Sequence, residues 1–227
     1  ADICGCSIKD LNKMLSGSLN IGITYTFAPI LTETLIAFMK EHPAVKLNIC
    51  YKTMEELMEK LTKRELDFVL SFRPSSLHPE IESHILFDNH LAVLMNRNHP
   101  LAEKKKLTLE ELLPHRIAMP SKGLQSRNTF DNLFPHAHEN LHIVAEINDV
   151  NMLLDVVSRT GLVTILSEAV VSQNERLKAI ALDYSDNIMQ GCVHTLRNSY
   201  RKRAAEEFIK MLRDSETVRV RANQWLG

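Results

Sequence analysis

Long apolar runs are absent from this chain of 227 residues, and none reaches the ~18 residues that a membrane-spanning helix needs. The opening stretch ADICGCSIKDLNKML is interrupted by Asp2, Lys9 and Asp10, unlike the apolar core of a signal peptide. Hydrophobic residues make up 44% of the chain and charged residues 24%, as in ordinary globular proteins. The composition therefore predicts a soluble protein with a sizeable core.

An excess of charge of one sign is also lacking, because 27 basic residues face 28 acidic ones and the formal net charge is -1. A domain that grips nucleic acid by itself is usually strongly basic, so this part of the protein is not expected to bind DNA directly. Cys4 and Cys6 are too close for an ordinary structural disulfide, and Cys50 and Cys192 lie in apolar, strand-like stretches. Reduced thiols and a cytoplasmic location are expected.

Catalytic motifs are missing as well. The chain has no G-x-S-x-G, no P-loop and no G-x-G-x-x-G, and no carboxylates are visibly paired, so we expect no enzymatic activity and no cofactor. His136, His138 and His142 have a spacing that could suggest a metal site. No cysteine or H-E-x-x-H pattern accompanies them, which favours a solvated loop, and we expect no metal.

What the chain does contain is an alternation of strands and helices, clearest from Ser18 to Phe72. Strands are predicted at 19–23, 45–51 and 66–72, with helices between them. The first helix has apolar residues at helical spacing (Ile30, Leu31, Leu35, Phe38 and Met39) and ends at His42-Pro43. A β-α-β-α-β unit of this kind forms a parallel sheet with right-handed crossovers.

A second α/β set follows. Strands are predicted at 90–96, 117–119, 141–147, 163–166, 177–182 and 191–196, and helices at 124–134, 150–158 and 201–214. Two similar sets predict an α/β fold of two lobes with a ligand cleft between them. The strands at 90–96 and 191–196 are the expected crossings, and the last helix is expected to return to the first lobe.

Ligands of open α/β sheets bind at the carboxyl ends of the strands. In the first lobe these ends carry Thr24, Tyr25, Thr26, Thr53, and Ser71 with Arg73. Hydroxyls and free N–H groups at such turns favour a small polar or anionic ligand. Helix capping is the alternative role for the threonines, and Arg73 could equally be a solvated side chain.

In the second lobe the corresponding turns carry Ser121 and Asn148 as candidate ligand contacts. Gln125 and Arg127 are further candidates. Asp149 is expected to act as the cap of the following helix.

Several segments, taken in order, resemble the effector-binding domain of LysR-type transcriptional regulators. They are G-S-L-N-I-G-I at 17–23, F-M-K-E-H-P-A-V-K-L at 38–47, L-x-x-x-L-x-x-x-x-L-D-F at 57–68, N-H-P-L-A at 98–102, L-x-L-E-E-L at 107–112 and E-I-N-D-V-N-M-L-L-D-V-V at 146–157. The resemblance spans roughly residues 17–213. The chain departs from the family pattern at Thr32, Arg64 and Ser167, where the family often has Pro, Gly and Pro.

The resemblance implies two Rossmann-like lobes, similar to the type 2 periplasmic binding proteins, with a small-molecule effector between them. It implies lobe I over 17–90 and 196–227, lobe II over 91–195, and the end of a linker helix at 1–16. It also implies a homodimer of this domain, formed by the helices near 28–41 and 149–159, and a tetramer of the full protein. DNA would be bound only through a helix-turn-helix that is absent from this chain. A periplasmic solute-binding protein and an enzyme of the same fold are the alternatives.

Overall fold

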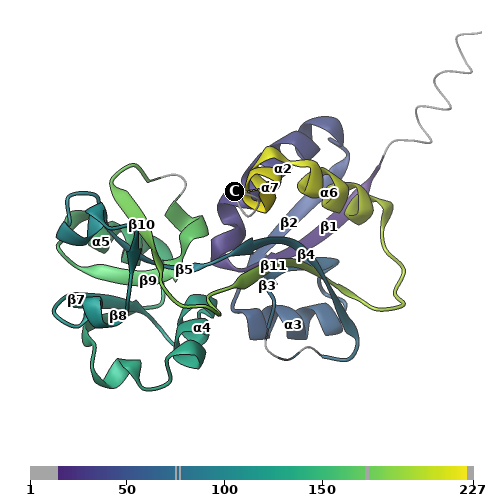
Figure 1. Ribbon diagram of the computed structural model, residues 1–227. Helices are drawn as coiled ribbons and strands as arrows, with labels where there is room; N and C mark the ends of the chain where they lie inside the picture. The colour runs from purple at the N-terminus through teal and green to yellow at the C-terminus, as the bar shows by residue number, and fades with distance from the viewer. Residues whose placement is uncertain (1–14, 75, 77, 172–173, 224–227) are drawn as a thin grey trace, which may run out of the picture.

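The strands form two separate sheets, one in each half of the molecule (Figure 1). The computed structural model describes residues 15–223 except 75, 77, 172 and 173, so most of the linker helix predicted at 1–16 lies outside the described residues. The prediction of an α/β fold with two Rossmann-like lobes is confirmed.

The first sheet has the order β2-β1-β3-β11-β4. Its strands are β1 (Gly17–Ile23), β2 (Val45–Tyr51), β3 (Phe68–Phe72), β4 (Ile81–Asn89) and β11 (Met189–Leu196). Strand β1 pairs in parallel with β2 and β3, while β11 runs antiparallel to β3 and β4. Helices α2 (Ala28–Glu41), α6 (Arg203–Asp214) and α7 (Glu216–Asn223) lie on one side, and α3 (Met54–Thr62) lies on the other (Figure 1). We call this half lobe I.

The second sheet has the order β6-β10-β5-β9-β7-β8. Its strands are β5 (Leu91–Asn96), β6 (Lys106–Leu107), β7 (Arg116–Pro120), β8 (His142–Ile147), β9 (Val163–Ser167) and β10 (Leu177–Leu182). Strand β7 pairs in parallel with β8 and β9, and β5 runs antiparallel to β9 and β10. Helices α4 (Gln125–Leu133) and α5 (Val150–Arg159) pack against it. We call this half lobe II.

Alternating residues of each strand face different helices. In β5, Leu91, Val93 and Met95 join the same apolar cluster as Phe130 of α4, whereas Ala92 and Leu94 join the cluster of α5. In lobe I, Gly22 faces α3, and a Cβ built there would come within 2.8 Å of Leu57 Cδ2 and 2.7 Å of Leu66 Cδ1. Because successive residues of a strand face opposite sides of the sheet, alternate residues of β5 and of β1 face different helical layers.

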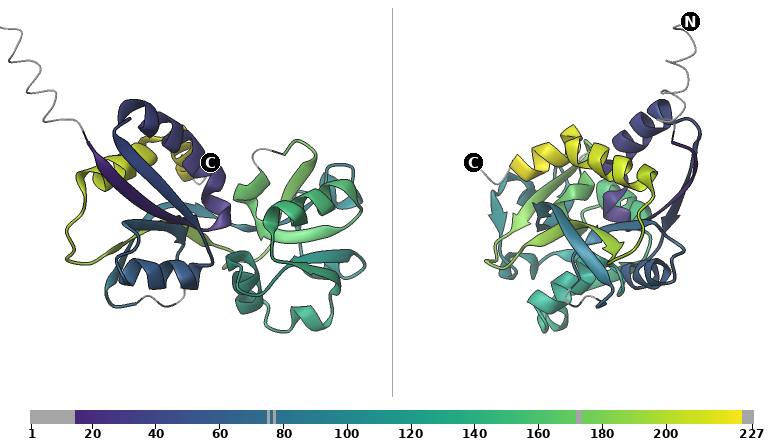
Figure 2. Two further views of the ribbon diagram at one scale, coloured as in Figure 1. Left: turned by 180° about the vertical axis from the view of Figure 1, so that it is seen from behind. Right: turned by 90° about the vertical axis from the view of Figure 1, so that its right-hand side faces the viewer.

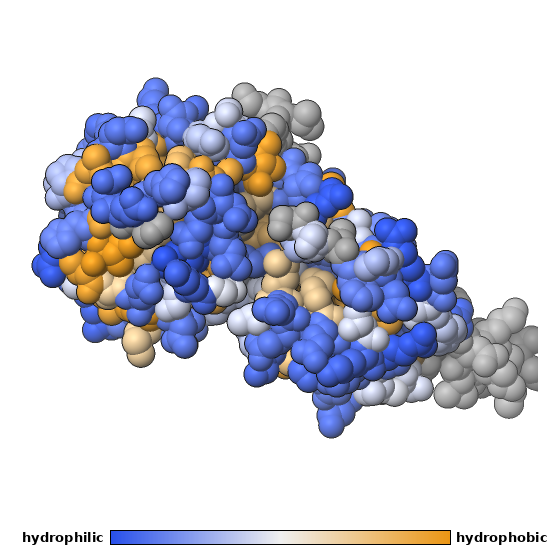
Figure 3. Space-filling model, turned by 90° about the horizontal axis from the view of Figure 1, so that it is seen from below, coloured by the Kyte–Doolittle hydropathy of each residue, from blue (hydrophilic) through white to orange (hydrophobic). Residues whose placement is uncertain are grey.

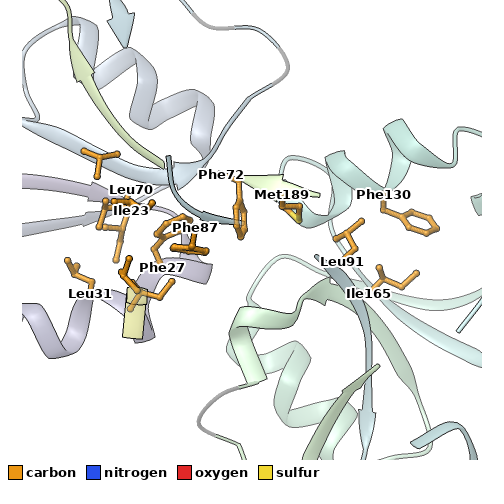
Figure 4. Close-up of a cluster of buried hydrophobic side chains, with 14 of the residues drawn as sticks. Ile23, Phe27, Leu31, Leu70, Phe72, Phe87, Leu91, Phe130, Ile165 and Met189 are labelled. Carbon is orange, nitrogen blue, oxygen red and sulfur yellow. The ribbon is translucent and has the colours of Figure 1, made fainter. Parts of the chain in front are cut away.

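One apolar cluster continues through both lobes (Figure 4). In lobe I it includes Phe27 and Phe72, whose ring centroids are 5.2 Å apart, and in lobe II it includes Phe130 and Ile165. Met189 is drawn between the two groups of side chains in Figure 4. Figure 3 shows two bulky lobes joined by a narrower middle.

Within the described residues the chain passes between the lobes at two places, and the second of these differs from the expectation. The first lies between β4 and β5, at His90, and the second lies between Leu182 and Met189. Strand β11 pairs within lobe I, although residues up to 195 were predicted to belong to lobe II. Strand β4 was not predicted, because its sequence IESHILFDN lacks a clear alternation and its partner lies about a hundred residues away in the chain.

Another correction concerns the surface of α2. Met39 was predicted to face the core, but it is 45% exposed, and Ile36 on the same helix is 60% exposed. Ile30, Leu31 and Phe38 are buried as predicted. The apolar stripe of α2 is therefore wider than the surface that lobe I covers.

Candidate functional site

A cavity of about 780 Å³ lies between the two lobes, where the carboxyl ends of the parallel strands face each other. Lobe I contributes the turn after β1 and the turn after β2, and lobe II contributes the turns after β7 and β8. The polar residues that line it are Thr24, Tyr25, Thr26, Thr32, Tyr51, Lys52, Thr53, Glu56, Gln125, Ser126, Asn148, Asp149 and Asn151.

Five of the eight predicted contact residues line this cavity: Thr24, Tyr25, Thr26, Thr53 and Asn148. Ser71, Arg73 and Ser121 do not. Ser71 is fully buried, and its hydroxyl donates to the carbonyl oxygen of Phe72.

Arg73 and Ser121 are engaged elsewhere. Arg73 is exposed and donates to Gln190 Oε1 at 3.3 Å, so it is bound to β11. The backbone N–H of Ser121 donates to the carbonyl oxygen of Ile147 at 3.0 Å, which extends the pairing of β7 with β8. At both positions the predicted side chain does not line the cavity.

The turn after β1 reaches across to lobe II. Thr24 is buried, and its hydroxyl donates to Gln125 Oε1 at 3.2 Å. The Tyr25 hydroxyl donates to Asn151 Oδ1 of α5. Burial raises the pKa of the Tyr25 hydroxyl, with smaller contributions from Tyr51 and Asp149, so this hydroxyl is neutral and able to donate at neutral pH.

The turn after β2 is a capping box. Thr53 Oγ1 accepts from the N–H of Glu56 at 3.4 Å, and the N–H of Thr53 donates to Glu56 Oε2 at 3.0 Å. The Thr53 hydroxyl also donates to Glu56 Oε2 at 2.8 Å. This hydrogen bond and then the one from the Thr53 N–H lower the pKa of Glu56, and Lys52 Nζ lies 3.3 Å from Glu56 Oε1. The capping role considered for Thr53 is confirmed, while its hydroxyl also borders the cavity.

On the lobe II side, Asp149 caps α5 as predicted, since its Oδ1 accepts from the N–H of Met152 at 2.7 Å. The N–H of Ser167 donates to Ser126 Oγ at 3.1 Å, which ties α4 to β9. Gln125 is the first residue of α4, and its side chain contacts lobe I.

Four helices begin at this cavity. Helices α3 and α5 carry the carboxylates of Glu56 and Asp149 at their first turns, whereas α2 and α4 have no side-chain cap. A helix N-terminus is partially positive and leaves N–H groups unpaired. The uncapped starts of α2 and α4 are therefore the parts of the wall most favourable to a negative group, with Lys52 nearby.

Two residues that bridge the lobes were ranked low or missed from the sequence. Gln125 was a secondary candidate and Asn151 was not considered, because both lie inside predicted helices rather than at strand ends. The signal that could have found them is the first turn of each helix, which faces the same edge of the sheet as the preceding turn. Arg127, another secondary candidate, is instead buried and forms ion pairs with Asp131 and Glu146 at 2.9 Å.

The chain matches the family model of the LysR substrate binding domain over residues 12–216. An HTH-type transcriptional regulator of Bacillus subtilis, YybE, is 30% identical over 142 residues, which cover 61% of this chain and 48% of that protein. The HTH-type transcriptional activator CmpR of Synechocystis is 26% identical over 142 residues, covering 62% and 46% respectively. The chain spans about half the length of the curated relatives it matches.

Solved structures share the fold. The CcmR regulatory domain of Synechocystis, in complex with 2-PG, superposes with a TM-score of 0.78 at 18% identity, covering 88% of this chain and 97% of that one. The cofactor-binding domain of the Cbl transcriptional regulator gives 0.75 at 22% identity, covering 90% and 91%. The effector-binding domain of QuiR, in complex with shikimate, gives 0.73 at 19% identity, covering 88% and 97%.

Two further findings concern only the residues that the structure describes. None of their helices is long and apolar enough to cross a bilayer. Nowhere among them do three or more histidine, cysteine or acidic side chains gather as metal ligands would.

Proposed function

Because the chain belongs to the family of LysR substrate binding domains, we propose that it senses a small-molecule effector in the cavity between its lobes. The observation that carries this proposal is the convergence of four strand-to-helix turns on one cavity of about 780 Å³. That volume lies within the usual range for small-molecule sites. The cavity has polar walls on both sides, so a ligand there would contact both lobes at once.

The cavity wall supports a small polar effector with one anionic group. The uncapped N-termini of α2 and α4 and the ammonium of Lys52 would attract that group. The carboxylates of Glu56 and Asp149 already occupy the other two helix starts, so they would repel a second negative charge. Neutral hydroxyl, amide or ammonium groups would suit that part of the cavity. The ligands named for CcmR and QuiR, 2-PG and shikimate, are reasonable first probes.

In the full protein, we propose, the effector controls transcription allosterically. The curated relatives are HTH-type regulators about a third longer than this chain, which supports a DNA-binding helix-turn-helix outside it. An effector that contacts both lobes binds one relative position of the lobes better than another, and it shifts the equilibrium by that difference in affinity. No catalytic role is part of this proposal, and the cytoplasmic location expected above follows from the regulatory role.

The effector proposal is tested by thermal-shift screening of small polar metabolites, with 2-PG and shikimate included. Thr26 lines the cavity, so Thr26→Ala should weaken the binding of any hit about tenfold while leaving the unliganded melting temperature nearly unchanged. The matched control is Thr62→Ala, at the far end of α3, whose hydroxyl donates to the carbonyl oxygen of Glu59. Equal affinity in both variants would remove this cavity as the binding site.

We further propose a homodimer that pairs α2 of one protomer with α5 of another. The support is apolar exposure on both helices: Ile36 and Met39 on α2 are 60% and 45% exposed, and Met152 on α5 is 59% exposed. Large exposed apolar residues that gather on one element often mark an interface. Ile36→Glu should therefore yield monomers in sedimentation experiments at micromolar concentration. Ile85→Glu, at a 49% exposed position of β4, should leave the dimer intact, and a wild-type monomer would contradict the proposal.

A further inference from the structure

The side chain of Gln125 is a direct polar link between the lobes at the floor of the cavity. It starts from the first residue of α4 in lobe II and makes four polar contacts with lobe I. Its Oε1 accepts from the N–H of Phe72 at 3.1 Å and from the Thr24 hydroxyl at 3.2 Å. Its Nε2 donates to the carbonyl oxygen of Phe72 at 2.9 Å and lies 2.9 Å from Met54 Sδ. Both acceptor sites of Oε1 and both N–H groups of Nε2 are thus directed at lobe I.

The position of this amide follows from how the β1–β3 pairing ends. The N–H of Thr24 donates to the carbonyl oxygen of Leu70 at 3.1 Å, as the last bond of the parallel ladder. If the ladder continued, the N–H of Phe72 would donate to the carbonyl oxygen of Thr24. That oxygen instead accepts from the N–H of Phe27 at 3.1 Å, because the chain turns into the 3-10 turn η1 (Tyr25–Phe27).

Phe72 therefore has a backbone N–H and a backbone C=O that lie beyond the end of the pairing with β1, and its C=O also accepts from the Ser71 hydroxyl at 3.1 Å. The Gln125 amide binds both groups, as the next peptide group of β1 would have done. A buried backbone N–H without an acceptor is costly, so the Phe72 N–H needs an occupant or water beside it. Gln125 supplies that occupant from the opposite lobe.

A second bridge lies nearer the mouth, between Tyr25 of lobe I and Asn151 of α5. The two links differ in setting, since the Gln125 contacts are part-buried and the Tyr25–Asn151 contact is exposed. The passages between the lobes are fastened separately: the Asn187 side chain bonds both backbone groups of Leu91 and the carbonyl oxygen of Leu182. The hydrogen bonds at the cavity and those at the passages thus involve different residues.

We propose that Gln125 is an intramolecular latch that holds the lobes closed in the absence of effector and occupies part of the effector's place. An effector that reaches the floor of the cavity must displace the Gln125 amide from Phe72. It would then need a group that accepts from the Phe72 N–H and the Thr24 hydroxyl, which a carboxylate, an amide or a lactam can do. The meaning of the latch rests on the proposed function, but its existence can be tested without any ligand.

The test measures hydrogen exchange of the Phe72 amide by NMR, together with the radius of gyration by small-angle scattering, on the ligand-free domain. In Gln125→Ala we expect the Phe72 N–H to exchange at least tenfold faster and the radius of gyration to increase. The N–H of Thr24, which bonds within lobe I, should keep its protection. The matched control is Asn132→Ala, which removes an exposed amide from the same helix and should change neither quantity.

Gln125→Glu refines the test and guards against a folding defect of the alanine variant. Its carboxylate can accept from the Phe72 N–H but cannot donate to the Phe72 carbonyl, so exchange should be intermediate between wild type and Gln125→Ala. Unchanged exchange at Phe72 and an unchanged radius of gyration in both variants would overturn the latch. That result would leave the proposed effector site standing, whereas a failed effector screen would leave the latch standing.

Discussion

The two lobes repeat one plan with different polar chemistry at the cavity. The order β2-β1-β3-β11 in lobe I corresponds to β8-β7-β9-β5 in lobe II, with the fourth strand antiparallel in each case. In both lobes the first helix begins without a side-chain cap and the second begins with one, Thr53 or Asp149.

The residues that face the cavity differ between the lobes. Lobe I presents hydroxyls, from Thr24, Thr26 and Tyr25, while lobe II presents the longer carboxamides of Gln125 and Asn151. Hydroxyls both donate and accept over a short reach, whereas a carboxamide can span a gap and bond two backbone groups together. Gln125 of lobe II reaches the backbone of Phe72 in lobe I, whereas Tyr25 of lobe I reaches Asn151 of lobe II, so each lobe extends a side chain across the cavity (Figure 2 shows the two lobes from two further sides).

The largest expected effect tests whether the lobes share one core. Phe208 in lobe I and Phe130 in lobe II are fully buried members of one contiguous cluster. Truncating either to alanine should cost about 3–5 kcal/mol of unfolding free energy. Urea denaturation followed by both fluorescence and circular dichroism should show one cooperative transition in each variant. Two separate transitions would mean that the lobes unfold independently.

The next expected effect is a pH dependence of the unfolding free energy that arises at β11 of lobe I and not at its counterpart β5 of lobe II. Strand β11 carries the buried His194, whereas its counterpart β5 reads LAVLMN and has no ionisable residue. Burial lowers the pKa of His194 to about 4 from 6.5, with its ring between Ser83 and the carbonyl oxygen of Ser71. The unfolded chain binds this proton near pH 6.5, so the stability is complete above that pH and is lost on acidification towards pH 4.

This loss should amount to roughly 1.4 kcal/mol per pH unit at most within that window. Urea denaturation at pH 7, 6 and 5 should show a shallower loss in His194→Gln than in the wild type. Parallel slopes for the two proteins would exclude His194 as the source of acid sensitivity in lobe I.

The smallest effect concerns the two capped helices. Thr53→Ala and Asp149→Ala each remove one N-cap, so each should cost about 1 kcal/mol of unfolding free energy. Chemical denaturation of the two variants would show whether the lobes are equally dependent on their caps. A cost near zero for one of them would mean that tertiary packing alone fixes the start of that helix.

The sequence predicted those parts of the fold that periodicity controls. The strands and helices from Ser18 to Phe72 were found because apolar residues repeat at two and at about four positions, and the caps at Thr53 and Asp149 followed from residue type. Strand β4 was missed because a long-range antiparallel partner, rather than its own pattern, makes it a strand.

The sequence predicted the turns that border the candidate site. It ranked Gln125 low and missed Asn151, the two lobe II residues whose side chains contact lobe I. Ser71 and Arg73 were placed in it because they end β3, yet at this strand end the backbone of Phe72 bonds with Gln125 while Arg73 contacts Gln190 of β11. Gln125 was ranked low because its partners lie some fifty and a hundred residues away in the chain, and only the closed arrangement of the lobes brings them within reach.

Binding of an effector between the lobes, in contact with both, can be tested by an NMR titration. The ¹⁵N-labelled domain is titrated with the compounds that raise its melting temperature. We expect chemical-shift changes at Thr24–Thr26 of lobe I and at Gln125 and Asn148–Asn151 of lobe II within the same titration. Shifts confined to one lobe, or gathered at a separate pocket of about 240 Å³ in lobe I that His84 and Arg201 line, would contradict binding between the lobes.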